Sequence, residues 1–160
     1  MPRISLFPND SMSAEQRAVH DRIVSGPRGR IQGPLRAALH NPELADKWQA
    51  LGALLRYGTT LPPRLSEIAI LVTGRACNSP FEWYAHRAEA EKAGVEQPVI
   101  EALLAQTEPP GLSPDGAAVY QYAIELNRHR SVSDATLAAE ASRSGTRCTA
   151  ASTCSMCCTR

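Results

Sequence analysis

The apolar residues of this chain recur mostly three or four positions apart, which is the spacing of an amphipathic helix. The alternation that indicates a strand is nowhere sustained. Prolines, glycines and capping residues divide the pattern, and we expect helices over about residues 13–25, 42–58, 63–77, 79–94, 97–105, 113–129 and from 133 onward. The sequence therefore predicts an all-α fold, a single-domain helical bundle over residues 1–137.

Capping signals mark the start of several predicted helices. Ser13 and Gln16 have the spacing of a capping box, and Ser79 and Glu82 repeat it. Asn41 stands directly before a proline at the first helical position, a favourable N-cap arrangement. Each of these signals predicts a helix start independently of the apolar periodicity.

Two predicted helices have the clearest apolar faces. The helix after Asn41 has an apolar stripe at helical spacing, formed by Leu44, Trp48, Leu51 and Leu55. The helix that opens at Pro62-Pro63 is expected to turn four apolar residues inward, namely Leu65, Ile68, Ala69 and Val72.

The composition changes near the C-terminus. Residues 138–160 contain no Val, Ile, Leu or aromatic residue, and Ala, Ser, Thr, Cys and Arg fill 20 of these 23 positions. Such a segment cannot offset its ordering entropy by packing large apolar groups, so it is predicted to be disordered or weakly helical. Its cysteines are badly spaced for zinc, because two are adjacent and no second Cys-x-x-Cys pair follows, so we expect no metal: Cys148, Cys154, Cys157 and Cys158.

Length and charge exclude several classes of partner. The chain has 160 residues, is 43% hydrophobic, and carries 17 basic against 16 acidic residues for a net charge of +1. This balance gives no electrostatic reason to expect nucleic acid or an anionic membrane as a partner. Prolines interrupt residues 1–41, where a signal peptide or a membrane helix would need an apolar run. The predicted location is therefore cytoplasmic.

Candidate chemistry gathers in residues 67–86. Glu67 lies early in one predicted helix, and Glu82 and His86 lie one turn apart on the next. A tight turn between the helices would bring the three together, and a carboxylate beside an imidazole prepares it for proton transfer. Structural roles account for the same residues: Glu82 as the partner of a Ser79 cap, Glu67 as a first-turn acid favoured by the helix dipole, and His86 as a satisfied, partly buried histidine.

The same region carries a family resemblance. The run Leu61-Pro-Pro-Arg-Leu-Ser-Glu-Ile-Ala-Ile-Leu71, then Glu82-Trp83, His86 and Ala93-Gly94-Val95, resembles the carboxymuconolactone decarboxylase family, which includes the alkyl hydroperoxidase D branch. Looser similarity extends from about residue 33 to residue 136. The resemblance implies an alkyl hydroperoxidase D-like helical bundle, a trimer or hexamer, with a pocket lined by the motif helices.

Sulfur distinguishes the branches of that family. The hydroperoxidase branch has a glutamate, a Cys-x-x-Cys pair and a histidine, and these positions fall on Glu67, on Ser79 and Glu82, and on His86. The disulfide chemistry of that branch therefore lacks both its thiols here. Cys77 lies two residues too early and is expected to be a small buried hydrophobe.

The resemblance thus favours the decarboxylase-like branch, which implies cofactor-free decarboxylation of a small carboxylated lactone or related acid in the breakdown of aromatic acids. Loss of CO₂ beside a carbonyl leaves an enolate-like charge that needs a donor and a proton. His86 is the predicted acid/base, with Glu67 and Glu82 as orienting carboxylates. By family geometry the substrate carboxylates would be bound by arginines, for which the candidates are Arg28, Arg30, Arg36 and Arg64.

Two other functions compete with this one: peroxiredoxin-like hydroperoxide reduction through Cys77, and a truncated, non-catalytic role. The second follows from the tail, because the hydrophobic final helix that the resemblance implies is missing from the sequence after residue 137. A GC-rich gene read in a shifted frame beyond about Ala138 to Ser142 would produce this composition. An apolar helix encoded in an alternative reading frame would confirm that hypothesis.

Overall fold

A computed structural model describes residue 4 and residues 11–144, with side chains in this range as far as residue 139. Within that part of the chain there are eight helices and no strand, so the all-α prediction is confirmed. None of these helices is long and apolar enough to cross a membrane. The contacts divide the chain into two compact units, residues 1–58 and residues 59–160. Each unit is described by itself, and a single domain over residues 1–137 remains a prediction.

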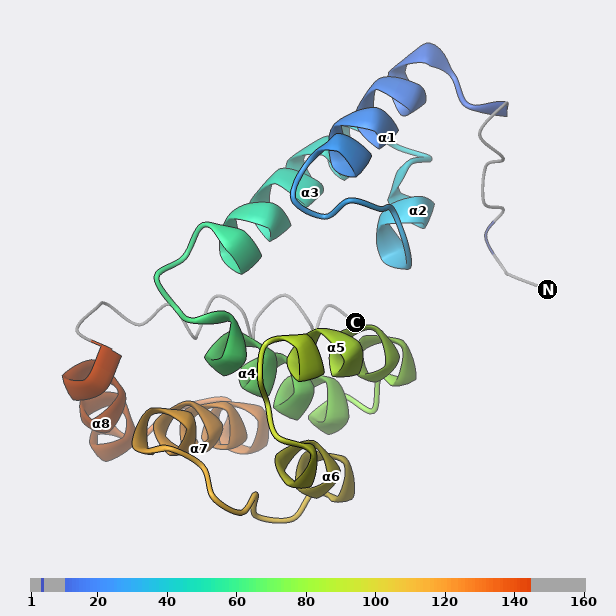
Figure 1. The fold of residues 1–160 in the computed structure, drawn as a ribbon. Helices are drawn as coiled ribbons and strands as arrows, with labels where there is room; N and C mark the ends of the chain where they lie inside the picture. Colours follow the sequence, from blue (N-terminus) through green and yellow to red (C-terminus); the bar gives the residue numbers. More distant parts are fainter. Residues whose placement is uncertain (1–3, 5–10, 145–160) are drawn as a thin grey trace. The chain divides into compact units, whose positions relative to one another are not determined.

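The N-terminal unit contains α1 (Ala14–Ser25), α2 (Pro34–Ala38) and α3 (Pro42–Tyr57) (Figure 1). The short α2 was not predicted, since five residues give too little periodicity to detect. Both α1 and α2 pack against α3 around a small core of four buried residues: Val19, Ile23, Leu39 and Ala45.

The apolar stripe predicted on α3 is not the buried face of this helix. Leu44 and Leu51 are exposed, whereas Ala45 and Gly52 are buried. Ala45 and Gly52 are seven residues apart and lie on one face of the helix, where small side chains let a neighbouring helix approach closely. Leu44 and Leu51 are therefore left on the surface of the unit, and Trp48 and Leu55 are half-buried.

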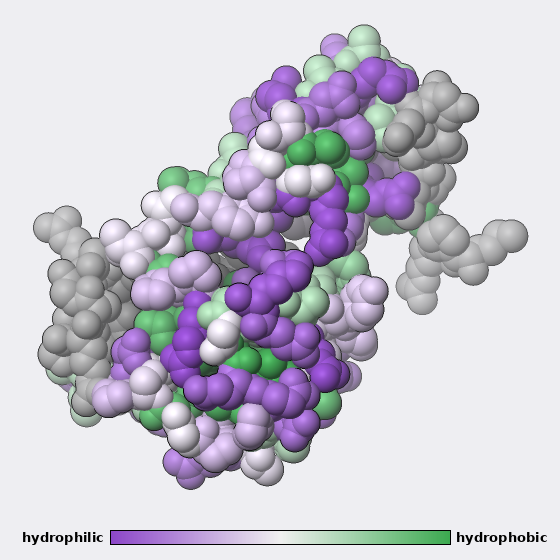
Figure 2. All heavy atoms as spheres, viewed as in Figure 1, coloured by the Kyte–Doolittle hydropathy of each residue, from purple (hydrophilic) through white to green (hydrophobic). Residues whose placement is uncertain are grey.

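The C-terminal unit is arranged around one helix. It contains α4 (Pro63–Ala76), α5 (Pro80–Lys92), α6 (Gln97–Ala105), α7 (Pro114–His129) and α8 (Asp134–Ser144). Helix α4 packs against α5, α6 and α7, and its ten residues from Leu65 to Gly74 are all buried. The four inward-facing residues predicted on this helix are among them, so that prediction is confirmed. The surface over α5 and α6 is largely hydrophilic, with apolar residues visible between them (Figure 2).

Side-chain caps form at some of the predicted positions and not at others. Ser13 and Gln16 make both hydrogen bonds of a capping box, and the Asn41 side chain accepts from the Leu44 amide at 3.1 Å. Ser79 occupies an N-cap position, but its side chain makes no capping hydrogen bond, so the second predicted capping box is wrong. The carboxylate that would complete it is engaged elsewhere, as described below.

This difference predicts that truncating the two N-cap side chains to alanine lowers the free energy of unfolding by unequal amounts. Asn41→Ala should lower the free energy of unfolding by about 1 kcal/mol, because a side-chain cap is lost. Ser79→Ala should change it by less than about 0.5 kcal/mol, because no such bond exists to lose. Urea unfolding of both variants, monitored by circular dichroism, measures the two costs. Equal costs would contradict the difference between the two N-termini.

The start of α8 is fixed by a carboxylate on α7. Both oxygens of Glu125 accept hydrogen bonds, Oε2 from the Ser133 amide at 2.9 Å and Oε1 from the Thr136 hydroxyl at 2.8 Å. The bonds from Ser133 and then Thr136 lower the pKa of Glu125 from its ordinary 4.5 to about 2. The ionised carboxylate therefore attaches α8 to the preceding helix.

We expect this attachment to weaken in acid. A carboxylate whose pKa is lower in the folded protein contributes stability that is complete above its unfolded pKa and is lost as the pH falls through the folded value. Amide hydrogen exchange of the first turn of α8 should thus become less protected between about pH 4.5 and pH 2. Glu125→Gln puts an amide NH₂ against a donor and should show weak protection already at pH 7. Equal protection in the two proteins at pH 7 would contradict the role of Glu125.

Helix α8 extends into the segment that begins at residue 138, whose boundary remains a prediction. The helix continues to Ser144, so the first seven residues of the segment predicted to be disordered or weakly helical form a continuous helix. The local composition is rich in alanine, which has the highest helix propensity, and this favours continuation. Residues 145–160, with the four cysteines of the tail, lie outside the described part of the chain.

Candidate functional site

A tight turn joins the two helices that carry the candidate residues. Asn78 has a positive φ of 48°, and the Ser79 amide donates to the Gly74 carbonyl at 2.9 Å, which reverses the chain between α4 and α5. A Cβ added to Gly74 would lie 3.3 Å from the Cβ of Glu82, closer than most such contacts. Glycine at this position therefore lets the first turn of α5 approach α4 closely.

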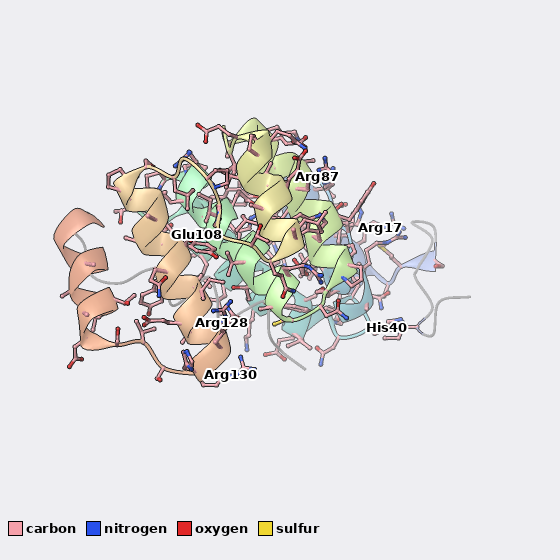
Figure 3. All side chains as sticks on the ribbon, turned by 90° about the horizontal axis from the view of Figure 1, so that it is seen from below. Arg17, His40, Arg87, Glu108, Arg128 and Arg130 are labelled. Atoms are coloured by element: carbon pink, nitrogen blue, oxygen red, sulfur yellow. The ribbon has the colours of Figure 1, made fainter. Side chains whose placement is uncertain are left out.

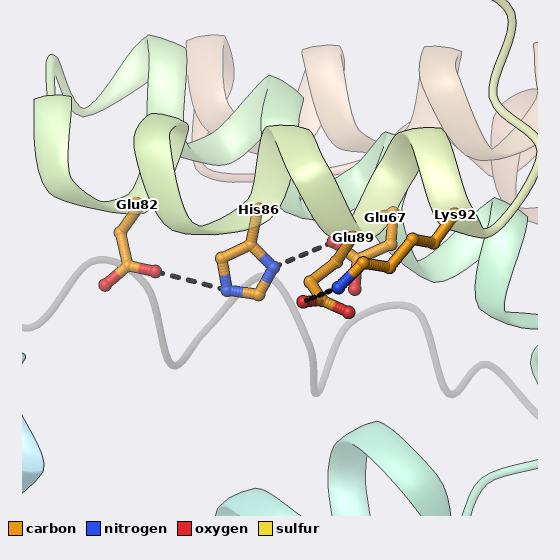
Figure 4. A network of polar contacts seen from close by, with 5 residues as sticks. All are labelled: Glu67, Glu82, His86, Glu89 and Lys92. Atoms are coloured by element: carbon orange, nitrogen blue, oxygen red, sulfur yellow. Dashed lines mark hydrogen bonds and ion pairs between the residues drawn. The ribbon is translucent and has the colours of Figure 1, made fainter. Parts of the chain in front are cut away.

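The predicted trio comes together across this helical hairpin. The Nδ1 atom of His86 lies 2.8 Å from Oε2 of Glu67, and its Nε2 atom lies 3.4 Å from Oε2 of Glu82 (Figure 4). The side chains are 11% exposed for His86, 8% for Glu67 and 22% for Glu82. The imidazole thus lies between two carboxylates in a setting from which most water is excluded.

The geometry gives the two ring nitrogens of His86 different roles. An ionised carboxylate can only accept, so Nδ1 carries a hydrogen and donates it to Glu67. The shorter contact, to the more buried carboxylate, fixes the ring orientation. The Nε2 atom has only the longer contact to Glu82, so it is the ring atom that can exchange a proton with another molecule.

Of the structural alternatives, two are wrong and one fits. Glu82 does not complete a cap at Ser79, and Glu67 lies beyond the first turn of α4 as a buried residue and not as an exposed first-turn acid. A satisfied, partly buried histidine describes His86 equally well. The convergence of the three residues is therefore a finding, and their chemical role is a proposal.

Arg64 is the one predicted arginine in the same unit as His86, and it is engaged with other residues. The Arg64 guanidinium donates to the Ser113 hydroxyl at 3.1 Å and lies 4.0 Å from a Glu96 carboxylate oxygen. It thereby links the start of α4 to the starts of α6 and α7. This engagement is structural and was not visible in the sequence, because the partners are 32 and 49 residues away.

The other three arginines belong to the N-terminal unit, so their part in the site remains a prediction. Arg36 lies in the last turn of α2, and Arg28 and Arg30 lie in the loop before it. The Nε atom of Arg28 is buried and has no hydrogen-bond partner among the residues that the structure describes. Burial, and next the nearby charge of Arg56, lower the pKa of Arg28.

Sequence reasoning missed two charged pairs on the same helix. Glu89 lies three residues after His86, and its Oε1 atom accepts from Nζ of Lys92 at 3.1 Å (Figure 4). Arg87 donates to Glu91 at 3.2 Å. Spacings of three and four residues on a helix were a sufficient signal for both pairs.

The expectation that Cys77 would be buried is wrong. This residue is the C-cap of α4 and is exposed, because the helix ends at the surface before the turn. Its sulfur is disulfide-bonded. Among the described residues, no group of three or more His, Cys, Asp or Glu side chains is arranged to hold a metal ion.

Comparison with known proteins supports the assignment that the motif suggested. No curated protein and no solved structure matched the chain. The model of the carboxymuconolactone decarboxylase family matches residues 42–125, just over half of the chain and including the whole α4–α5 hairpin. The match spans Glu67, Glu82 and His86, and the all-helical fold agrees with it. The chain therefore belongs to the carboxymuconolactone decarboxylase family.

Proposed function

We propose that this protein is a cofactor-free carboxy-lyase that decarboxylates a small carboxylated lactone or a related acid in the breakdown of aromatic compounds. The observation that carries this proposal is the imidazole of His86 placed between two carboxylates, 2.8 Å from Glu67 and 3.4 Å from Glu82. Membership of the family supports it, and the arrangement suits a reaction that requires proton transfer to carbon.

The proposed reaction uses His86 as the acid. The bond between the substrate carbon and its carboxylate breaks, and the electron pair moves into the neighbouring carbonyl to give an enolate and CO₂. The Nε2–H of His86 then delivers its proton to the carbon that lost CO₂, and the ring regains a proton from water. Glu67 keeps Nδ1 protonated and holds the ring in place, and Glu82 orients the ring from the side of Nε2.

A substrate carboxylate needs a cation, and the candidates differ in position. Arg64 is already paired with Glu96 and Ser113, so we regard it as less suited than the sequence suggested. Lys92 shares α5 with His86, but its charge is likewise paired, with Glu89 at 3.1 Å. Arg28, Arg30 and Arg36 remain proposed ligands of the substrate.

Deuterium labelling tests the reaction directly. The purified full chain would be incubated in D₂O with a panel of carboxylated lactones and related acids, with a metal chelator present, and CO₂ release and the products would be followed by NMR. We expect release of CO₂ with one deuterium at the carbon that lost it. Absence of CO₂ from every substrate of a chain that unfolds cooperatively would contradict the proposal. Reduction of hydroperoxides that is lost in Cys77→Ser would instead favour the thiol function.

We further propose that the protein is a cytoplasmic homo-oligomer, a trimer or hexamer as in the family. The exposed apolar residues of α3 support association, because exposed apolar surface of this kind often marks an interface: Leu44, Leu51, Leu54 and Tyr57. Sedimentation of the wild type and of Leu51→Glu would test this. A monomeric wild type would contradict it.

A further inference from the structure

A pocket lies in the C-terminal unit between α4, α6 and α7, and neither Glu67 nor His86 lines it. It has a volume of about 240 Å³, and its apolar wall is formed by Val72, Leu103 and Ile124. Val72 and Ala76 are four residues apart and so face the pocket together, whereas Gly74 between them faces Glu82 on α5. The pocket and the proposed catalytic cluster are therefore on different faces of α4.

Positive charge borders this apolar wall. The Arg75 guanidinium is held in place by Nε donating to the Leu104 carbonyl at 2.8 Å and by Nη1 donating to Asn78 Oδ1 at 3.4 Å. A guanidinium has five N–H donors, and within the described part of the chain no hydrogen bond from the Nη2 edge of Arg75 is found, so this edge can donate to a ligand. Arg128, in the last turn of α7, also lines the pocket, and no ion pair is formed by it within the described residues.

The remaining lining is neutral. Tyr120 contributes a phenol whose pKa is raised by burial, so at pH 7 it is a neutral donor or acceptor, and Asn127 contributes an amide. Glu108 is close enough to act on the Tyr120 phenol but does not line the pocket, and no lining residue is acidic. An apolar wall with two guanidiniums and no carboxylate selects a ligand with a compact apolar body and a negative charge.

We propose that this pocket is a second ligand site that binds a small monocyclic carboxylic acid, with the ring against Val72, Leu103 and Ile124 and the carboxylate between Arg75 and Arg128. The volume is below the roughly 300–1,000 Å³ typical of drug-sized ligands, which suits a single ring. Planar guanidiniums suit a carboxylate because they can bind both oxygens. The site requires no reaction at His86 and stands independently of the proposed activity.

Benzoate is the probe for this site, with benzamide as its neutral counterpart. Titration of the full chain, followed by NMR shifts of backbone amides, should show millimolar binding of benzoate with the largest shifts around Tyr120 and Asn127. Arg128→Gln should weaken this binding about tenfold, the usual value of one charge-assisted hydrogen bond. Ala76→Leu should abolish it, because Ala76 is exposed on the pocket wall and a larger side chain fills the space.

Arg130→Gln is the matched control, because this substitution removes the same charge. Arg130 also lies at the end of α7, but it does not line the pocket (Figure 3). The Arg130→Gln substitution should leave the dissociation constant unchanged within about twofold, and His86→Gln should do the same. Equal affinity for benzamide, equal loss in Arg128→Gln and Arg130→Gln, or no benzoate binding at millimolar concentration would each overturn the proposal. Binding lost in His86→Gln and kept in Ala76→Leu would place the ligand at the catalytic cluster and overturn it as well.

Discussion

Replacing His86 by glutamine is expected to lower kcat/KM for decarboxylation by about 10²–10⁴-fold, the usual contribution of a general acid or base. Glutamine can still donate a hydrogen bond towards Glu67, so the buried carboxylate is not left without a partner. It cannot carry a proton from water to the substrate carbon. The loss should therefore appear in kcat, measured by CO₂ release, with little change in the thermal midpoint.

His86→Ala provides the second member of the pair. It should lose as much activity, and it should also lose stability, because it removes the donor that satisfies a largely buried carboxylate. An unsatisfied buried polar group costs about 1–3 kcal/mol, and more when it is charged. Comparing the two variants therefore separates the proton-transfer role of the ring from its structural role.

His20→Ala is the matched control for both variants. His20 also contacts a carboxylate, with Nδ1 2.9 Å from Asp21 Oδ1, but it lies on α1 beside an exposed acid. It should keep wild-type activity. If His86→Gln retained more than a tenth of the wild-type kcat/KM, the assignment of His86 as the acid would be wrong.

Local spacing was enough to predict the relation between two of the three residues of the candidate site. Glu82 and His86 are four residues apart on one helix, so they share a face in any packing of the chain. The position of Glu67 was predictable only through the turn at Asn78 and the order of the family motif, because it lies on a different helix. Sequence could not decide whether Glu82 would cap Ser79 or turn to His86, since both partners lie within its reach.

The structure shows what made the difference for Glu82. Gly74 allows the first turn of α5 to lie directly against α4, and the imidazole of His86 is positioned there by its short contact with Glu67. This choice depends on the packing of two helices and not on the residues next to Glu82. A local capping pattern is therefore weak evidence where a stronger partner lies one turn along the helix.

Local patterns have the same limit for the fold, because they do not show which helices pack together. Four apolar residues of α4 were expected to face inward, and the structure buries every residue from Leu65 to Gly74. The stripe on α3 gave an equally clear period, yet its Leu44 and Leu51 are exposed, because periodicity identifies an apolar face but not whether a partner covers it. The bonds to Glu125 on α7 from Ser133, just before α8, and from Thr136 on α8 were likewise outside local reasoning, since they join different elements.

The burial of α4 leads to the largest expected effect on stability. Ile68 is fully buried in the main core of the C-terminal unit, among residues of α4, α6 and α7. Ile68→Ala should lower the free energy of unfolding by about 2–5 kcal/mol through lost burial and a residual cavity. Because whole domains are stable by only about 5–15 kcal/mol, the thermal midpoint should fall by on the order of 10 °C.

A graded series tests whether burial is the cause. Ile68→Val removes one methylene and should cost only about 0.5–1.5 kcal/mol. Leu104→Ala removes a side chain of similar size from an exposed position on α6 and should change stability by less than about 0.5 kcal/mol. Calorimetry of the three variants gives the order directly. If Leu104→Ala lowered the free energy of unfolding as much as Ile68→Ala, the central position of α4 in the core would be contradicted. Lost packing at Ile68 would then matter no more than a change at the surface.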